Sequence, residues 1–366
     1  MSRGFLRGAP LGLTLAIAFV FGPGRTDAAA PEGSALLIEL PREALPAAEG
    51  ANGFVVSGSL LNGGGFHWMP TAGVTPIGGR QVIASSADGR TIVGTALDPS
   101  GLEQAAIWTG GTTWRLLGSV KPSARPCDLL LSGAYGASDD GRVVVGLGWD
   151  GCGYARAFRW EESNGMVDLG SLNGRSTRAN GVSGDGRVVV GWQQDATGFR
   201  QGARWIDGKE EVIPGPSGFV GEAFDANRDG SLIVGAGCNP ANVSGPASAW
   251  TWTASAGLKC HPVVPPTWAP SFPYQVIMKS TSDDGRVIAG ALSFGLDSEA
   301  LVWFDGEPFF LRDYLRSHGV PDAFRGWINT GFTTDVSADG RTLVGYGAGP
   351  NTFQGWMVLL PKLEAR

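Results

Sequence analysis

A short β-hairpin that ends in glycine recurs seven times along this chain, and a tryptophan follows each copy at a nearly constant distance. Two copies read Asp139-Asp-Gly-Arg-Val-Val-Val-Gly146 and Gly184-Asp-Gly-Arg-Val-Val-Val-Gly191. The tryptophans that follow the copies are Trp68, Trp108, Trp160, Trp205, Trp250, Trp303 and Trp356. A repeat period of roughly 36 to 55 residues, built from strands and turns, is typical of a radial repeat architecture.

The best-preserved repeat unit, residues 157–206, indicates what one unit contains. Short runs rich in β-branched and aromatic residues alternate with turn residues at a spacing of about ten residues, as expected of consecutive strands. The four runs are Ala157–Trp160, Met166–Gly170, Ala179–Ser183 and Arg187–Gly191. Four strands are the content of one propeller blade. The sequence therefore predicts an all-β fold, a β-propeller of seven four-stranded blades; a ring of six or eight units and a β-solenoid are the alternatives.

The two ends of the repeat region are expected to complete one blade together. The last unit stops after its tryptophan strand, Gln354–Pro361, and lacks the strand that follows in the other units. Residues Ser34–Leu40 stand at the missing position in the repeat frame. Their pairing would close the ring and remove exposed sheet edges, which invite aggregation. One short helix is expected in a late insertion, because the apolar residues of 311–318 have helical spacing before Gly319.

The first 30 residues have the pattern of a secretory signal peptide. Arg3 and Arg7 precede an apolar run over residues 9–21, and small residues suited to cleavage follow at 28–30. The apolar run is too short for a comfortable membrane span. We expect cleavage of residues 1–30, a single repeat domain over residues 31–366, and a secreted, extracellular or periplasmic location; a retained anchor is the alternative.

Four cysteines in an exported chain indicate two disulfides, because export delivers them to an oxidising compartment. Three pairings are possible. We favour the two pairs that each lie within or beside one repeat unit, which are Cys127 with Cys152 and Cys238 with Cys260. A four-cysteine zinc site would need closely paired cysteines, such as Cys-x2-Cys, and the chain has no such spacing.

The bulk composition suits a packed repeat fold. Hydrophobic residues make up 43% of the chain and charged residues 17%, so each repeat can bury a core of its own. The formal net charge of −6 argues against nonspecific binding to nucleic acid, which needs clustered positive charge. We therefore expect no nucleic-acid partner, and no membrane span once the signal peptide is cleaved.

Most of the repeated residues have structural explanations. The Asp-Gly pair supplies the tight turn of each hairpin, and one large aromatic residue per unit usually packs between neighbouring units. The segment Asp225-Ala-Asn-Arg-Asp-Gly230 matches the opening of a calcium loop, but Ala236 stands where an EF-hand needs a glutamate. The same segment is in frame with the ordinary hairpins. We expect no metal site and no cofactor.

Residues that do not recur in the repeat are better candidates for ligand binding. Four aromatic residues and the histidine next to Cys260 fit this description, and the predicted ligand-binding residues are Trp149, Tyr154, His261, Trp268 and Tyr274. The three histidines of the chain lie in no recognisable nucleophile or metal pattern. A Gly-x-Ser-x-Gly elbow between a strand and a helix is absent from the sequence, as is a P-loop. No catalytic residue is predicted.

One stretch of the chain resembles the bacterial HAF-repeat extracellular proteins. It consists of Ala157-Phe-Arg-Trp160, Gly165-Met-Val-Asp-Leu-Gly-Ser-Leu172 and Ala179-Asn-Gly-Val-Ser-Gly-Asp-Gly-Arg-Val-Val-Val-Gly191. Ala157-Phe158 keeps two of the three letters that name the repeat, with Arg156 in place of the histidine. The likeness extends over approximately residues 35–361 and implies propeller-like repeats and a freely secreted or periplasmic protein. The family has no established activity, so the resemblance implies fold and location only.

These observations predict a secreted, non-catalytic binding or interaction module for an extracellular glycan or protein. A polysaccharide hydrolase or lyase on the same scaffold is one alternative, and it requires carboxylates with perturbed pKa values that converge at the propeller axis. A purely structural surface component, which would self-associate, is the other alternative.

Overall fold

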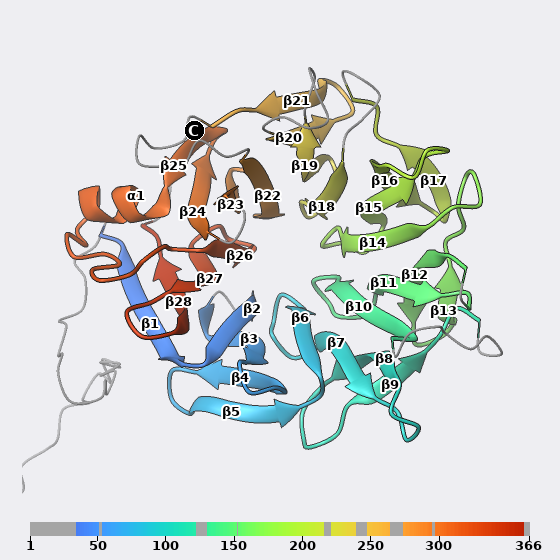
Figure 1. Ribbon diagram of the computed structural model, residues 1–366, viewed down its shortest axis with the longest axis horizontal. Helices are drawn as coiled ribbons and strands as arrows, with labels where there is room; N and C mark the ends of the chain where they lie inside the picture. Colours follow the sequence, from blue (N-terminus) through green and yellow to red (C-terminus); the bar gives the residue numbers. More distant parts are fainter. Residues whose placement is uncertain are drawn as a thin grey trace, which may run out of the picture.

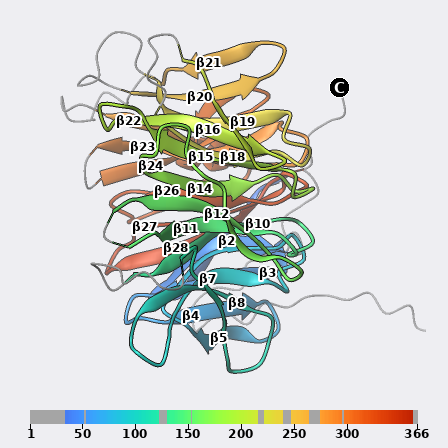
Figure 2. The ribbon, with the colours of Figure 1, turned by 90° about the vertical axis from the view of Figure 1, so that its right-hand side faces the viewer.

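The computed structural model describes residues 34–50, 53–121, 130–151, 153–215, 221–238, 247–263, 274–294 and 297–361. Within these ranges, seven antiparallel groups of four strands stand around a central axis like the blades of a propeller (Figure 1). Seen at right angles to this axis, the strands form a disc that is thinner along the axis than across it (Figure 2). The predicted seven-bladed β-propeller is confirmed.

Each blade begins at its innermost strand and continues outward. Blades 1 and 2 consist of β2 (Ala44–Gly50), β3 (Val55–Leu60), β4 (Gly65–Met69) and β5 (Gly73–Gly78), then β6 (Gln81–Ser85), β7 (Ile92–Leu97), β8 (Glu103–Trp108) and β9 (Arg115–Gly118). Blades 3 and 4 consist of β10 (Ser132–Ala137), β11 (Val144–Trp149), β12 (Ala155–Glu161) and β13 (Gly165–Asp168), then β14 (Thr177–Val182), β15 (Val188–Gln194), β16 (Arg200–Ile206) and β17 (Lys209–Val212).

The remaining blades follow the same order. Blades 5 and 6 consist of β18 (Glu222–Ala226), β19 (Leu232–Cys238), β20 (Ser248–Thr253) and β21 (Gly257–His261), then β22 (Gln275–Thr281), β23 (Val287–Phe294), β24 (Asp297–Phe304) and β25 (Glu307–Phe310). Blade 7 consists of β26 (Phe332–Val336), β27 (Thr342–Ala348), β28 (Phe353–Leu359) and β1 (Leu36–Arg42). A single pair, Ala236 with Ile277, joins blades 5 and 6 into one eight-stranded sheet.

Blade 7 is completed by the N-terminal strand, as the sequence predicts. β1 pairs antiparallel with β28, and Ile38 lies opposite Met357 in the register. Ile38 and Leu40 are buried in a cluster that also contains Trp68 of blade 1. The first described strand therefore ties the last blade to the first and closes the ring (Figure 1).

The repeated turn is held by its own side chains. In blade 4, the Ser183 hydroxyl and the Arg187 N–H both donate to Asp185 Oδ1, at 2.6 and 2.9 Å, and Gly186 follows with a φ of +75°. The Val188 N–H donates in turn to the Ser183 hydroxyl at 3.0 Å. The same arrangement recurs around Asp88, Asp140, Asp284 and Asp339. The structural interpretation of the Asp-Gly turns is confirmed.

The suggested calcium ligands are likewise engaged in local structure. Asp229 Oδ1 accepts from the Ser231 N–H at 2.9 Å, as in the other turns. Asn227 Oδ1 accepts from the Leu232 N–H at 2.8 Å, and the Asp225 carboxylate lies on the innermost strand of blade 5 instead of in the turn. The three oxygen-bearing side chains therefore do not converge as they would in a calcium loop.

The glycine that ends each hairpin explains a second regularity. Every innermost strand has a register shift of one residue, a β-bulge, against the next strand, and the glycine lies opposite it. A Cβ atom on the glycine would come closer than 3.0 Å to a carbonyl oxygen of the innermost strand in all seven copies. Only glycine permits this close approach of two backbones. The seven glycines are Gly58, Gly94, Gly146, Gly191, Gly235, Gly290 and Gly345.

The phased tryptophans fill the space between neighbouring blades. Trp205 of blade 4 is buried against Val143 and Val145 of blade 3. Trp250 of blade 5 is buried against Val188 of blade 4 in the same way. The packing interpretation of the repeated tryptophans is confirmed, because each side chain supplies the bulk that separates two sheets.

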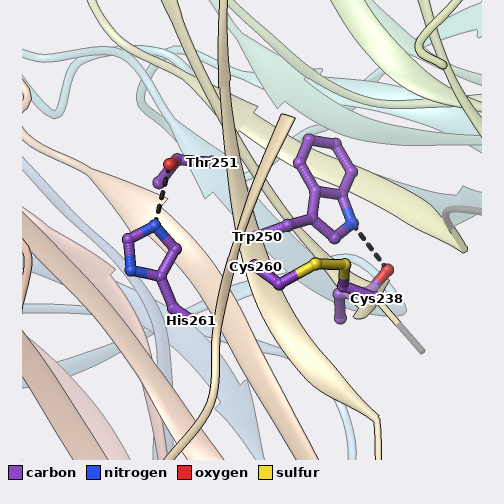
Figure 3. The surroundings of a disulfide bond; sticks show 6 residues. Cys238, Trp250, Thr251, Cys260 and His261 are labelled. Atoms are coloured by element: carbon purple, nitrogen blue, oxygen red, sulfur yellow. Dashed lines mark hydrogen bonds between the residues drawn. A yellow bond between two sulfur atoms is a disulfide. The ribbon is translucent and has the colours of Figure 1, made fainter. Parts of the chain in front are cut away.

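A disulfide joins Cys238 on β19 to Cys260 on β21 within blade 5, with 5.9 Å between the Cα atoms (Figure 3). This pairing was predicted; Cys127 and Cys152 lie outside the described residues. The predicted helix is present as α1 (Leu311–Ser317), and Gly319 follows it with a φ of +92°. In the ranges that the structure describes, no helix is long and apolar enough to cross a membrane.

Candidate functional site

The innermost strands of all seven blades line a channel of about 680 Å³ along the propeller axis. Each innermost strand runs toward the face that carries the Asp-Gly turns, which we call the turn face; the opposite face, where these strands begin, is the loop face. The seven bulge residues all line this axial channel, and they are Ala47, Ile83, Tyr135, Asn180, Phe224, Lys279 and Thr334. Each stands five positions before the repeated aspartate, or before Asn52 in the first repeat.

The bulge residues divide the channel wall into two unlike parts. Blades 1 and 2 present the short or aliphatic side chains of Ala47 and Ile83. Blades 4, 5 and 6 present Asn180, Phe224 and Lys279. With Tyr135 of blade 3 and Thr334 of blade 7, the hydrogen-bonding, aromatic and charged bulge residues therefore come from five consecutive blades.

Lys279 is the central feature of this wall. Its Nζ lies 4.7 Å from the centre of the Phe224 ring, within the range of a cation–π contact. Among the described residues, no acceptor or carboxylate is within bonding distance of this ammonium group. Burial in the channel wall lowers the pKa of Lys279, and the positive charge of Arg178 lowers it further, while the Asp225 carboxylate opposes this effect.

Two aspartates follow the bulge residues of blades 5 and 7 and face each other across blade 6. Asp335 Oδ1 accepts a hydrogen bond of 2.7 Å from the Ser280 hydroxyl, and Asp225 interacts with the same side chain. Asp225 Oδ2 also accepts from the Thr281 N–H at 3.0 Å. Burial raises the pKa of Asp225 to about 7, and burial also raises the pKa of Asp335. Ser280 thus links two carboxyl groups that hold protons more readily than ordinary aspartates.

Glu49 of blade 1 is a third acidic residue of this part of the wall, next to Asp335. Its backbone N–H donates to Asp335 Oδ2 at 3.1 Å, and its own Oε2 accepts from the Gly53 N–H at 2.8 Å. Burial raises the pKa of Glu49 well above its usual range, and the neighbouring Asp335 charge raises it further. Three carboxyl groups in one desolvated wall cannot all ionise without strong repulsion, so protons can be held and exchanged at this level of the channel.

The turn-face mouth is spanned by one arginine. The Arg228 guanidinium of blade 5 lies 3.2 Å from Asp139 of blade 3 and 3.1 Å from Asp283 of blade 6. Burial and the nearby Asp283 charge raise the pKa of Asp139. Because the ion pairs are exposed to solvent, they contribute little stability, but they place a side chain across this end of the channel.

The loop-face mouth carries paired cations and aromatic rings. Arg178 and Arg200 both contact the Glu222 carboxylate, the former at 3.0 Å. Arg178 also lies 5.2 Å from the centre of the Tyr135 ring, and Arg200 lies 4.5 Å from the Trp192 ring. The arginines at this mouth are therefore already engaged with protein groups.

The predicted ligand-binding residues lie elsewhere, and none of the described ones lines the axial channel. Trp149 ends β11, and Tyr154 precedes β12 with 42% of its surface exposed and Arg156 5.6 Å from its ring. His261 ends β21 (Figure 3), where its Nε2 lies 2.9 Å from Thr251 Oγ1.

Burial lowers the pKa of His261 to about 4, with a further contribution from Lys259, so the imidazole is neutral at physiological pH. Tyr274 precedes β22, and its ring packs edge-to-face against Phe294 at 6.5 Å. Trp268 lies outside the described residues. These side chains belong to blades 3, 5 and 6, and the structure does not gather them into one site; their role in binding stays a prediction.

Sequence reasoning missed the channel residues, although a signal for them exists. The bulge residue and the two that follow it are small or apolar in several repeats, but blades 5 to 7 place Asp225, Lys279 and Asp335 there. Blade 1 adds Glu49 at the second position after its bulge residue, so alignment of the innermost strands on the repeated turn would have isolated four charges. In the parts of the chain that the structure describes, no group of three or more His, Cys, Asp or Glu residues is suited to a metal ion.

Comparison with known proteins defines the fold. No protein-family model matches the chain, and no curated protein matches it in sequence. Among solved structures, U3-55K is similar with 13% identity and a TM-score of 0.51, over 90% of this chain and all of that one. TolB from Acinetobacter baumannii has 14% identity and a TM-score of 0.46 over 71% of this chain.

The β-propeller domain of the trilobed protease from Pyrococcus furiosus has 12% identity and a TM-score of 0.49, over 89% of this chain and 95% of that one. The chain spans only 63% of the length of the Acinetobacter TolB. At such low identities the likeness concerns the backbone alone. The chain is a β-propeller, and its function has to be argued from the axial channel.

Proposed function

We propose that this protein is a secreted or periplasmic binding module, similar to the HAF-repeat extracellular proteins, that takes part of an extracellular glycan into its axial channel. The observation that carries this proposal is the Lys279 ammonium group, which faces the channel beside Phe224 without a hydrogen-bond partner among the described residues. The signal peptide expected at residues 1–30 and the disulfide in blade 5 support the location.

A purely structural role does not account for this wall. Lys279 is half-buried in the channel wall, so its ammonium group loses part of its hydration without gaining a hydrogen bond to the described residues. A ligand that supplies hydrogen bonds to the ammonium group offsets that cost. The channel volume of 680 Å³ lies within the usual range of ligand pockets and suits a small polar group more than a flat protein surface.

The test is a set of thermal melts of the chain without residues 1–30, produced with its disulfides formed. Ligands would be neutral and acidic oligosaccharides, with calcium and EDTA as controls. Binding to the folded state raises its stability by about 2.7 kcal/mol at a ligand concentration of 100 Kd. We expect a rise in Tm with at least one sugar class, lost in Lys279→Met. Absence of any shift across the panel would refute a glycan site in the channel.

A polysaccharide hydrolase or lyase is the second candidate, because the carboxyl cluster it requires is present at the axis. Asp225 and Asp335 share the Ser280 hydroxyl, and the pKa of Asp225 is raised to about 7. A carboxyl group with a pKa near neutrality can both give and take a proton, and most glycosidases use a pair of carboxyl groups.

This second candidate is tested on any polysaccharide that the protein binds. New reducing ends would report hydrolysis, and the ultraviolet absorbance of unsaturated sugar ends would report elimination. Either signal should disappear in Asp225→Asn. A bound polysaccharide that is recovered intact after prolonged incubation would leave the binding module as the function.

A further inference from the structure

The charges along the axial channel follow an order from the loop face to the turn face. Arg178 and Glu222 form an ion pair at the loop-face mouth. Lys279 comes next, at the level of the bulge residues, and the Asp225 and Asp335 carboxyl groups stand one residue further along their strands. A ligand that passes the Arg178–Glu222 pair therefore meets the Lys279 ammonium group before it meets the Asp225 and Asp335 carboxyl groups.

The cationic side chains of the channel differ in whether they have an ion-pair partner. Arg178 is paired with Glu222, and Arg228 is held between Asp139 and Asp283. Within the described ranges, Lys279 contacts an aromatic ring but no carboxylate. An ammonium group without an ion-pair partner attracts an anionic ligand more strongly than the paired arginines do, because no protein carboxylate has to be displaced.

We propose that Lys279 binds the carboxylate of a uronate residue that enters the axial channel from the loop face, an inference that rests on the glycan-binding function proposed above. The Phe224 ring beside the ammonium group offers an apolar face to the sugar ring. Asn180, at the same level of the wall, is held by Arg178 and by the Ala223 carbonyl oxygen, so it shapes the wall and leaves the ammonium group as the free polar contact.

The carboxyl groups beyond Lys279 limit how far the anion can travel. An ionised ligand carboxylate is repelled by Asp225 and Asp335, so it stops at the level of the ammonium group, while neutral hydroxyl groups can contact the carboxyl oxygens. The wall thus distinguishes the acidic edge of the sugar from its hydroxyl groups. A peptide would meet the same ammonium group only through an acidic side chain or its C-terminal carboxylate.

Binding of an anion at this point is coupled to protonation of the wall. The charged groups that act on Lys279 come from three other strands, and they are Arg178, Glu222, Asp225 and Asp335. Glu49 contacts Asp335 in the same wall. A ligand carboxylate beside them raises the pKa of the three channel carboxyl groups, so protons are taken up on binding. Because the pKa of Asp225 in the free protein is about 7, affinity should increase as the pH is lowered from 8 to 6.

The experiment is isothermal titration of the chain without residues 1–30 with a galacturonate trimer, a mannuronate trimer and the methyl ester of each. The methyl esters keep the sugar rings and remove the charge. A sulfated oligosaccharide and an acidic peptide complete the set. We expect at least one uronate trimer to bind about tenfold more tightly than its ester, which corresponds to about 1.4 kcal/mol, and to bind more tightly at pH 6 than at pH 8.

Two variants separate the lysine from general effects. Lys279→Met should abolish the preference for the acid over the ester, whereas Asp225→Asn should reduce the pH dependence of that preference. The matched control is Lys259→Met, because Lys259 is an exposed residue of β21 outside the channel wall. Since Lys279 makes no ion pair with the described residues, Lys279→Met should melt at or above the temperature of the parent chain. Such a Tm would show that the loss of binding is not caused by a loss of folding.

The outcomes distinguish failure of this inference from failure of the proposed function. Equal binding of trimers and esters, or an unchanged preference in Lys279→Met, would overturn the uronate inference while a glycan site remained. Binding of only the sulfated sugar or only the peptide would overturn it by assigning a different anion to Lys279. Absence of binding by every sugar tested would refute both the inference and the glycan-binding function.

Discussion

Replacement of Gly146 by alanine tests whether the bulged innermost strands require glycine opposite them. Gly146 on β11 faces Ala134 on β10, beside the bulge at Tyr135. A Cβ atom on Gly146 would lie 2.9 Å from Cε1 of Phe158 and 3.0 Å from Cα of Ala134, and closer still to the carbonyl oxygen of Gly133. Two of these three contacts are backbone atoms, so the clash cannot be relieved by a side-chain rotation.

The expected loss follows from this crowding. Insertion of one carbon into a well-packed site costs about 1–3 kcal/mol, and occasionally more. Because the innermost strand would have to move away from β11, we expect Gly146→Ala to lower the free energy of unfolding by about 3 kcal/mol. For a chain of 366 residues, an unfolding entropy of about 0.8 kcal/mol/K converts this loss into a fall in Tm of about 4 °C.

Gly133→Ala is the matched control, because it changes the same pair of strands. A Cβ atom on Gly133 would find its nearest neighbours, Thr95 and Tyr135, at 3.4 Å, which is ordinary contact, and Gly133 does not have a positive φ. Alanine at a compatible position stabilises a protein by about 0.4–1 kcal/mol. The two variants should therefore move the Tm in opposite directions.

The assay is thermal melting followed by circular dichroism, with guanidinium unfolding as a second measure. If Gly146→Ala and Gly133→Ala had the same Tm as the parent chain, the close approach of the backbones would not be what selects glycine in the repeat. Equal destabilisation by both would mean that alanine is poorly tolerated throughout this pair of strands, whatever its distance from the carbonyl oxygens.

Three further changes have defined outcomes. In the folded protein the pKa of Asp225 is raised from 3.8 to about 7, so the folded state binds a proton that the unfolded state releases. The free energy of unfolding therefore falls as the pH rises through this interval. Asp225→Asn should remove up to about 4 kcal/mol of that fall, measured by denaturant melts at pH 4 and pH 8. Replacement of both Cys238 and Cys260 by alanine removes a link between residues 22 positions apart and should lower the free energy of unfolding by about 3 kcal/mol. Reductant should lower the Tm of the parent chain for the same reason, and an unchanged Tm would contradict this. Leu40 of the closing strand β1 is 1% exposed, so Leu40→Ala leaves a cavity and should lower the free energy of unfolding by about 2–5 kcal/mol. A smaller loss would show that β1 contributes little to closure of the ring.

The fold could be predicted because its repeated residues each have a local cause. Asp185 and Gly186 specify a turn through short-range hydrogen bonds and a positive φ, and these do not depend on the rest of the molecule. Trp205 marks a buried strand because one large side chain per unit has to separate two sheets. The missing strand at the C-terminus then made Ser34–Leu40 the natural partner of β28.

The site could not be predicted from the same pattern, because the bulge changes which side chains face the axis. In a regular strand, residues alternate between two faces, and a shift of one residue reverses the alternation. Lys279 is the extra residue of such a bulge, between Met278 and Ser280, and its direction therefore depends on a pairing that strand propensity does not encode. The exposed Tyr154 lies in a loop and stands out as unusual in the sequence, whereas Lys279 lies within a strand whose neighbours are mostly apolar.

The constancy of the glycines and the variety of the bulge residues have one explanation. Opposite each bulge the backbone requires glycine, so this position is the same in all seven blades. The bulge side chain itself lies in the channel wall, where its size and charge differ from blade to blade. Folding therefore permits alanine in blade 1 and lysine in blade 6 at equivalent positions. The ligand binding proposed above therefore depends on a position whose residue type the repeat does not determine.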